Sequence, residues 1–416
     1  KNIQKKDIKI KVNKKLWKQM KEKVKKDFNR SYCDTDCLLI LISLALYKKK
    51  HSLRCEDSLY LLVDNLTDLA EENYIFKTIS IYGKLMENLK DVYEKFNYSQ
   101  IVERAIVDYL SLPLNFYTNY ISPLYTIVGS KNYTMQKATA KAVDNMSLSH
   151  KDMVLIDACC ATGSLFFGLE TYEWKKVILN DMSALRTNFL NVLKSEPLKL
   201  IKMILDTDMT FIEKANSKNE KLQIYKETTD NYEDKRKNYK KVDCNIEIAY
   251  KMFFRQCIDK AYIEGSDKIL SRILKFLPAR LKLQNATITK ADCLTYLKND
   301  TSKLVLLDVP YIGSEKECAI KGYRYEPFHG KVANLLQQAE YPFIYYCRSS
   351  APKSDTSKSS EDKLKIMKFK LGLYFLDKGF NFQKVHLKED TELLVSNQEY
   401  DAEVQFQWTD FEQDLL

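Results

Sequence analysis

The first 113 residues contain one order of structural elements twice. Apolar and polar residues alternate over Asp7–Val12, the period of a strand with one buried face. Helical spacing follows, and after a polar break a second helix is expected over Cys37–Tyr47. About 68 residues later, Thr78–Ile81 alternates and helices are expected over 85–92 and 101–110. Because the pattern Phe-Asn-x-Ser occurs in both copies, we interpret this region as a duplicated strand-helix-helix unit.

The positive charge of the chain is concentrated in its first fifty residues. They hold fifteen Lys and one Arg against five acidic residues, a net charge of +11, while the whole chain carries +10. A basic module joined to a nearly neutral body predicts a polyanionic partner, most simply nucleic acid. The other interpretation is a lysine-rich face that only keeps the chain in solution.

The two units resemble the ribbon-helix-helix DNA-binding family, and Y-S-Q-I-V-E-R-A-I-V-D-Y-L at 98–110 is the closest segment. The resemblance implies that the two strands pair antiparallel and enter the major groove of double-stranded DNA as a ribbon. The side chains that it places against the bases are Lys9, Lys11, Thr78 and Ser80. It also implies that the second helices hold phosphates at their N-termini, where the first copy instead has Asp34 and Asp36. The alternative is two unrelated helical hairpins that brace the next domain.

From Ser122 onward, short apolar strands alternate with helices, which is typical of a doubly wound α/β sheet. The strand predicted over Met153–Ile156 leads into the small-residue turn D-A-C-C-A-T-G-S. Two further strands are predicted over Lys176–Leu179, followed by Asn180-Asp181, and over Leu304–Leu307, followed by Asp308. Ligands of such sheets bind at the carboxyl ends of the strands. The sequence therefore predicts a binding site at the turn and these acids.

Five segments occur in an order that resembles the Dam-like family of adenine-N6 DNA methyltransferases. They are S-P-L-Y-T-I-V-G-S-K, D-A-C-C-A-T-G-S-L-F-F, I-L-N-D-M-S, I-T-K-A-D-C and L-L-D-V-P-Y. The resemblance covers roughly residues 122–397 and implies S-adenosylmethionine as the cofactor. Family positions are altered at Ile127, Ser130, Cys159, Ala161 and Val309.

The resemblance assigns a role to each matching position. The residues implied to bind the cofactor are Lys131, Asp157, Ala161, Gly163 and Ser164, with Asp181 at the ribose and Asp292 near the adenine ring. Asp308 and the Val309 carbonyl would accept the N–H groups of the target amine, within the catalytic segment that Pro310 and Tyr311 complete. Tyr311 would stack on a base flipped out of the duplex.

These patterns predict a mainly α tandem ribbon-helix-helix region over 1–113 and a Rossmann-like α/β methyltransferase domain over 114–416. A helical insert at about 190–290 would recognise the target DNA. In the insert, Lys235, Arg236 and Lys237 form a basic cluster suited to phosphates, or equally a solvated or disordered charged segment.

Ten scattered cysteines without a C-x-x-C pair favour reduced thiols in a cytoplasm and no metal site. No apolar run is long enough to predict a membrane span. We therefore expect a cytoplasmic adenine-N6 DNA methyltransferase held on DNA by its N-terminal region. The alternative is a non-catalytic DNA-binding regulator with a degenerate methyltransferase-like domain.

Overall fold

The computed structural model describes residues 5–50, 74–93, 96–124, 133–207, 244–258, 266–299, 302–310, 325–348, 380–386 and 391–398. Its contacts divide the chain into two compact units. Residues 1–119, 191–239 and 243–284 form the first, here called the ribbon unit, and the remaining residues form the second, the sheet unit. The domain boundary predicted at 113/114 concerns independent folding and stays a prediction.

The ribbon unit is built on two antiparallel strands, β1 (Lys5–Asn13) and β2 (Tyr74–Tyr82). Alternation along both strands buries one face, which contains Ile8, Ile10, Val12, Ile79 and Ile81. Helices α1 (Lys14–Phe28) and α2 (Asp34–Lys50) follow β1, and helices α4 (Gly83–Val92) and α5 (Tyr98–Ser111) follow β2. The predicted order of elements in the two copies, and the antiparallel pairing of their strands, are confirmed.

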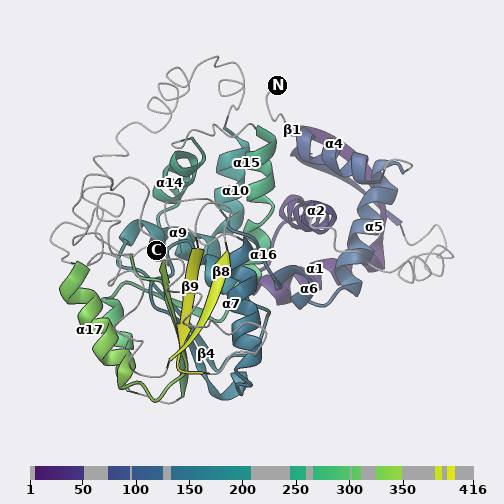
Figure 1. The fold of residues 1–416 in the computed structure, drawn as a ribbon. Helices are drawn as coiled ribbons and strands as arrows, with labels where there is room; N and C mark the ends of the chain where they lie inside the picture. Colours follow the sequence, from purple (N-terminus) through teal and green to yellow (C-terminus); the bar gives the residue numbers. More distant parts are fainter. Residues whose placement is uncertain are drawn as a thin grey trace. The chain divides into compact units, whose positions relative to one another are not determined.

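Helix α2 is the centre of the ribbon unit. Ten of its residues, Cys37–Ile42 and Leu44–Tyr47, are apolar and buried, and Ser43 between them is buried as well. A helix that is apolar on all sides must be covered on all sides. It packs against α5, α4, β2 and α16 (Phe276–Lys282) (Figure 1).

The covering helix α16 belongs to the predicted insert rather than to either copy of the repeat. With α10 (Pro197–Leu205), α14 (Ile246–Ile258) and α15 (Ser266–Ile273), it lies in the ribbon unit, where it also contacts α1 and the short α6 (Asn115–Thr118). Arg280 of α16 donates a hydrogen bond of 3.2 Å to the carbonyl of Phe28 at the end of α1. The insert helices therefore share a core with the repeat.

The Phe-Asn-x-Ser match has different structural roles in the two copies. Asn29 follows α1 in the left-handed conformation, with φ of 49°, and ends that helix. Asn97 instead precedes α5 and caps its N-terminus, in a reciprocal pair of hydrogen bonds with Gln100. Asn29 thus begins the turn between the helices of the first copy, whereas Asn97 ends the corresponding turn of the second copy. The equivalence of the copies therefore rests on their element order and strand pairing.

The sheet unit contains seven strands in the order β5-β4-β3-β6-β7-β9-β8. Their bounds are β3 Val154–Asp157, β4 Lys176–Asn180, β5 Ala286–Thr289, β6 Lys303–Leu307, β7 Phe343–Arg348, β8 Asn381–His386 and β9 Thr391–Ser396. Strands β3 to β7 are parallel to one another, and β9 is antiparallel to its neighbours β7 and β8. The predicted α/β sheet is confirmed, with an antiparallel hairpin at one edge (Figure 1).

Helices α7 (Tyr133–Asn145) and η3 (His150–Asp152) precede β3. Helices α8 (Ser164–Gly168), α9 (Ala184–Ser195), η4 (Cys293–Tyr296) and α17 (Tyr325–Gln337) lie between successive parallel strands. The chain leaves β3 towards β4 and β5 and later returns to place β6 on the other side of β3. That reversal is the switch point at which doubly wound sheets bind ligands. Among the described helices, none is both long and apolar enough to cross a membrane.

A buried hydrogen bond between the two copies of the repeat yields a prediction about stability. Tyr109 of α5, only 1% exposed, donates a hydrogen bond of 2.7 Å to the carboxylate of Asp27 on α1. Tyr109→Phe should lower the free energy of unfolding by about 1–3 kcal/mol, because the buried carboxylate loses a donor. Chemical denaturation of both proteins measures the difference.

The matched control is Tyr98→Phe, which removes the same hydroxyl from a side chain that is 38% exposed. Its free energy of unfolding should stay within about 0.5 kcal/mol of wild type. Equal effects of the two substitutions would contradict a stabilising role for the Tyr109–Asp27 bond.

Candidate active site and nucleic-acid interface

Three acidic side chains meet at the carboxyl ends of adjacent parallel strands. Asp157 is the last residue of β3, Asp181 directly follows β4, and Asp308 directly follows β6. In the sheet register, Asp157 pairs with Leu179 and with Leu306, so the other two acids each stand two residues beyond its partners. The three acids that the sequence predicted at the strand ends are therefore brought to one edge of the sheet.

Asp157 is the least compensated charge of this group. The residue is fully buried, and neither carboxylate oxygen has a hydrogen-bond partner in the described part of the chain. Burial raises the pKa of Asp157 well above its usual value, and the charges of Asp308 and Asp181 raise it further. Backbone N–H groups of Phe166 and Cys159 oppose the shift, but neither has the geometry of a hydrogen bond to the carboxylate. A cation beside Asp157 would relieve this imbalance.

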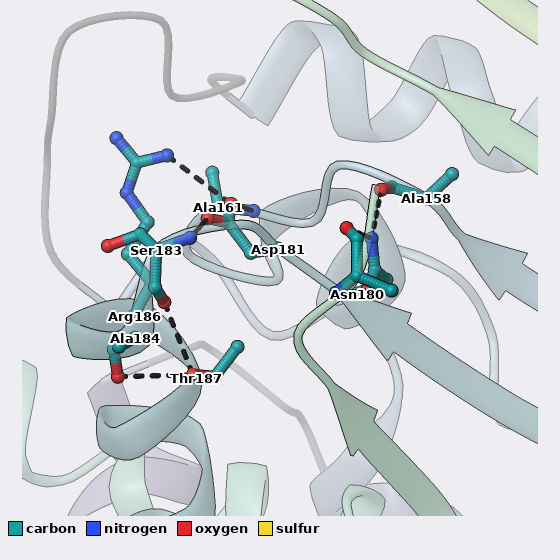
Figure 2. Close-up of polar contacts among 9 residues, drawn as sticks. Ala158, Ala161, Asn180, Asp181, Ser183, Ala184, Arg186 and Thr187 are labelled. Carbon is teal, nitrogen blue, oxygen red and sulfur yellow. Dashed lines mark hydrogen bonds and ion pairs between the residues drawn. The ribbon is translucent and has the colours of Figure 1, made fainter. Parts of the chain in front are cut away.

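Asp181 is, by contrast, held by its own surroundings. One oxygen accepts the backbone N–H of Ser183 at 2.7 Å, and the other accepts the N–H of Ala161 at 2.9 Å and a guanidinium N–H of Arg186 at 3.3 Å (Figure 2). The carboxylate thereby ties the turn after β3 to the start of α9. Oδ1 of Asp181 accepts only the N–H of Ser183 among these three hydrogen bonds, so it can accept one more.

Asn180 connects the loops after three strands, a role that the sequence analysis did not assign. Its buried amide donates to the carbonyls of Ala158 and Ala291, both at 2.9 Å (Figure 2). Its oxygen accepts the N–H of Ala291 at 2.8 Å and the hydroxyl of Thr289 at 3.0 Å. The amide thus uses all its hydrogen-bonding capacity. A polar residue at the end of an otherwise apolar strand was the available signal.

The small-residue turn contains two residues with left-handed backbone. Ala161 has φ of 48°, which costs a residue with a side chain on the order of 1 kcal/mol, and Gly163 has φ of 73°. A Cβ on Gly163 would also lie 2.8 Å from the ring of Phe167. Glycine is therefore required at 163, whereas Ala161 carries strain. Ser164 is buried at the start of α8, and its carbonyl accepts a hydrogen bond of 2.6 Å from Gln136.

The other residues predicted for this site differ in exposure, and some of them lie outside the described residues. Asp292 is exposed and caps η4 by accepting the N–H of Leu294 at 3.0 Å. Val309 is buried, and Pro310 is half-buried. Lys131, Tyr311 and the cluster Lys235, Arg236 and Lys237 lie outside the described residues. No group of three or more potential metal ligands occurs among the residues that are described.

His329 supports the segment after β6, a role that the sequence did not indicate. It is 4% exposed on α17, and its Nε2 lies 3.1 Å from the carbonyl oxygen of Pro310. Because that oxygen only accepts, Nε2 donates the hydrogen bond, and Nδ1 lies 2.9 Å from the hydroxyl oxygen of Tyr345. The ring thereby fixes the backbone two residues beyond Asp308.

The predicted DNA-facing residues share the outward face of the ribbon. Lys9 lies opposite Thr78, and both are exposed. Lys11 and Ser80 are half-buried on the same face, two residues along their strands. The geometry of a two-stranded ribbon with polar outward side chains is therefore present, while its binding to DNA stays a prediction.

Two acids occupy the start of α2. Asp34 accepts hydrogen bonds from Lys77 at 2.7 Å and Lys21 at 2.9 Å, and Asp36 forms an ion pair with Lys202 of α10. Although burial opposes ionisation, the two lysines lower the pKa of Asp34. Carboxylates thus fill a helix N-terminus that could otherwise hold a phosphate.

The buried carboxylate of Asp157 predicts a pH-dependent stability. An aspartate in the unfolded chain ionises near pH 3.9, whereas folding raises the pKa of Asp157. Below about pH 4, Asp157 is protonated in both states and does not lower the free energy of unfolding. As pH rises from there towards the folded pKa, Asp157 ionises only in the unfolded chain, and the free energy of unfolding falls. Asp157→Asn should raise the melting temperature of the ligand-free protein at pH 7 and leave it nearly unchanged at pH 3.5. Thermal melts at both pH values test this.

Asp152→Asn serves as the control, because Asp152 is an exposed aspartate of the same unit. It should show no gain at pH 7. A melting temperature of Asp157→Asn that falls at pH 7 would contradict the prediction that the ionised carboxylate destabilises the fold.

No protein-family model matches the sequence, and no curated protein matches it. Among solved structures, the chain is similar to one described as "a putative class i s-adenosylmethionine-dependent methyltransferase" from Listeria monocytogenes. The two are 11% identical, the match covers 94% of this chain and 89% of the other, and the TM-score is 0.28. A likeness this low supports no conclusion about activity, so the function has to be argued from the geometry of the site.

Proposed function

We propose that this chain is an S-adenosylmethionine-dependent DNA adenine-N6 methyltransferase that is held on double-stranded DNA by the β1–β2 ribbon. The observation that carries the proposal is the convergence of Asp157, Asp181 and Asp308 at the switch point of the sheet, with Asp157 buried and unsatisfied. The order of these acids along the chain is the one implied by the methyltransferase resemblance.

The charges of the site suit the proposed cofactor. S-adenosylmethionine has positive charges on its ammonium and sulfonium groups, and Asp157 is a buried carboxylate without a counter-charge among the described residues. The Asp181 oxygen bound by Ser183 can accept one ribose hydroxyl in addition. Gly163 lets the backbone of the turn approach a ligand closely because it lacks a Cβ.

The residues after β6 provide acceptors for the substrate amine. S-adenosylmethionine supplies, when bound, a methyl group activated by a positively charged sulfur. Asp308 and the carbonyl of Val309 would accept the two N–H bonds of adenine N6 and increase the electron density on that nitrogen. The base has to leave the duplex to reach them. His329 would keep this backbone in place through the carbonyl of Pro310.

A second candidate function is a DNA-binding regulator without catalysis. It is favoured by one observation: Arg186 and the N–H of Ala161 already bind the carboxylate of Asp181 that a ribose would use. Calorimetric titration with S-adenosylmethionine distinguishes the two, because the regulator would release no binding heat. Transfer of labelled methyl groups to mixed-sequence DNA then tests catalysis.

Loss of the Asp308 carboxylate should separate catalysis from cofactor binding. We expect Asp308→Ala to reduce methyl transfer at least about 100-fold, because the acceptor that orients the amine is gone. Cofactor affinity should be retained, since the charge of Asp308 opposes ionisation of Asp157 and its removal makes that ionisation easier. Steady-state transfer rates and calorimetric titration of the same preparation measure the two effects.

The matched control is Glu340→Ala, which removes one exposed carboxylate from the same unit and should leave both quantities unchanged. Full transfer activity in Asp308→Ala would refute the assignment of this residue. Cofactor binding without transfer in the wild-type chain would contradict the proposed catalysis.

Binding to DNA should depend on the outward lysines of the ribbon. Lys9→Ala/Lys11→Ala should weaken binding of mixed-sequence duplex DNA and lower the slope of log affinity against log salt by up to about 2, since each phosphate contact releases roughly one counterion. Fluorescence anisotropy at several salt concentrations gives both quantities. The control Lys176→Ala/Lys331→Ala removes the same charge from exposed sites in the sheet unit. Equal losses in the two variants would indicate non-specific attraction only.

A further inference from the structure

The outward face of the ribbon contains an aromatic side chain that neither the repeat nor the charge pattern explains. Phe76, the third residue of β2, is 76% exposed, while the other exposed large hydrophobic residues of the described chain reach at most 47%. Single exposed apolar residues are common on protein surfaces. This one stands on the face that carries the predicted DNA-facing residues, which gives its exposure a specific meaning.

The register defines the surroundings of Phe76. It lies opposite Lys11, and Tyr74 and Thr78 are its neighbours on the same face of β2. The ammonium of Lys11 lies 4.9 Å from the centre of the Tyr74 ring. An apolar ring is therefore flanked by a cation and a hydroxyl on one exposed surface.

The charge of the two strands determines which partner fits this surface. They contain five lysines against one aspartate, Asp7. Three of these lysines bind acids of the chain: Lys5 pairs with Asp206, Lys6 with Glu87, and Lys77 with Asp34. Lys9 and Lys11 flank the exposed ring, since Lys11 is opposite Phe76 and Lys9 is opposite Thr78, and the charge of Lys11 also acts on Glu103 of α5. A basic surface with an apolar centre fits a polyanion that presents an apolar group between its charges.

We propose that Phe76 recognises thymine through the 5-methyl group, and this inference rests on the proposed binding of double-stranded DNA. In the major groove, thymine is the base that presents a methyl group, and a phenylalanine ring is a suitable contact for it. A two-stranded ribbon is narrow enough to enter that groove. Phe76 thus adds an apolar selectivity to the polar contacts of Lys9, Lys11 and Thr78.

The test replaces thymine by uracil in the DNA, which removes the methyl group and keeps base pairing. The full chain is titrated into labelled mixed-sequence duplexes of about 25 base pairs, prepared with thymine or with deoxyuridine throughout. Wild type should bind the thymine duplexes at least about fourfold more tightly, the value of one buried methyl group. Phe76→Ser should bind both kinds equally, with the affinity of wild type for the uracil duplexes.

Two further variants make the result specific. Phe76→Leu keeps an apolar side chain and should retain part of the preference. Lys9→Ala should lower the affinity for both kinds of duplex by the same factor and leave the ratio of the two affinities unchanged. Since Phe76 is mostly exposed, its replacement should not unfold the ribbon unit, and thermal melts check this.

The outcomes separate this inference from the proposed function. Tight binding of both duplexes by wild type with equal affinity would overturn the role of Phe76 and leave DNA binding intact. The same holds if Phe76→Ser keeps the preference for thymine, because the methyl group would then be recognised elsewhere. Absence of binding to either duplex would overturn the proposed binding of DNA itself and the inference with it.

Discussion

The buried carboxylate of Asp157 imposes the strongest electrostatic constraint on the sheet unit. The end of β3 is enclosed by apolar residues, and two more acids follow the neighbouring strands. Like charges in a low-dielectric environment repel strongly, so such an edge is stable only if the charges are neutralised or bound. Asp181 is bound by Arg186 and by backbone N–H groups. Asp157 has no such partner among the described residues, so protonation or a bound cation would have to neutralise it. The proposed function follows from this difference between two neighbouring acids.

The loops around these acids are held by neutral groups. Asn180 fastens the turn after β3 to the segment after β5 with four hydrogen bonds, and His329 fixes the carbonyl of Pro310 after β6. A satisfied polar network specifies one backbone arrangement, because each alternative would leave a buried donor or acceptor unpaired. The site is thus held in place before any ligand binds, and Ala161 can keep its left-handed conformation within it.

In the ribbon unit, the equivalent constraint is the burial of α2. This helix is apolar on every side, and α5, α4 and β2 of the repeat pack against it together with α16 of the insert. The strands of the ribbon, the second copy and the insert therefore belong to one core.

Much of this architecture was predictable, because period and strand ends are local properties. Alternation over Asp7–Val12 and Thr78–Ile81 predicted both ribbon strands, and acids after apolar runs predicted the edge at which Asp157, Asp181 and Asp308 meet. The Phe-Asn-x-Ser match was a less reliable signal, since identical letters end one helix and begin another. Short motifs cannot distinguish these roles, because the role of Asn depends on backbone angles that the neighbouring turn sets.

The sequence by itself determined the element order, the buried faces and the chemical types available at the strand ends. Only the tertiary structure decided that Arg186 would bind Asp181 while Asp157 found no hydrogen-bond partner among the described residues. It also decided that Asn180 would connect the segments after β3 and β5, and that α16 would pack against α2. The physical reason is distance along the chain. Periodicity reports on neighbours a few residues apart. Hydrogen-bond satisfaction and helix burial depend on groups far apart in the chain, such as Arg280 and Phe28, which are 252 positions apart and meet only when the chain has folded.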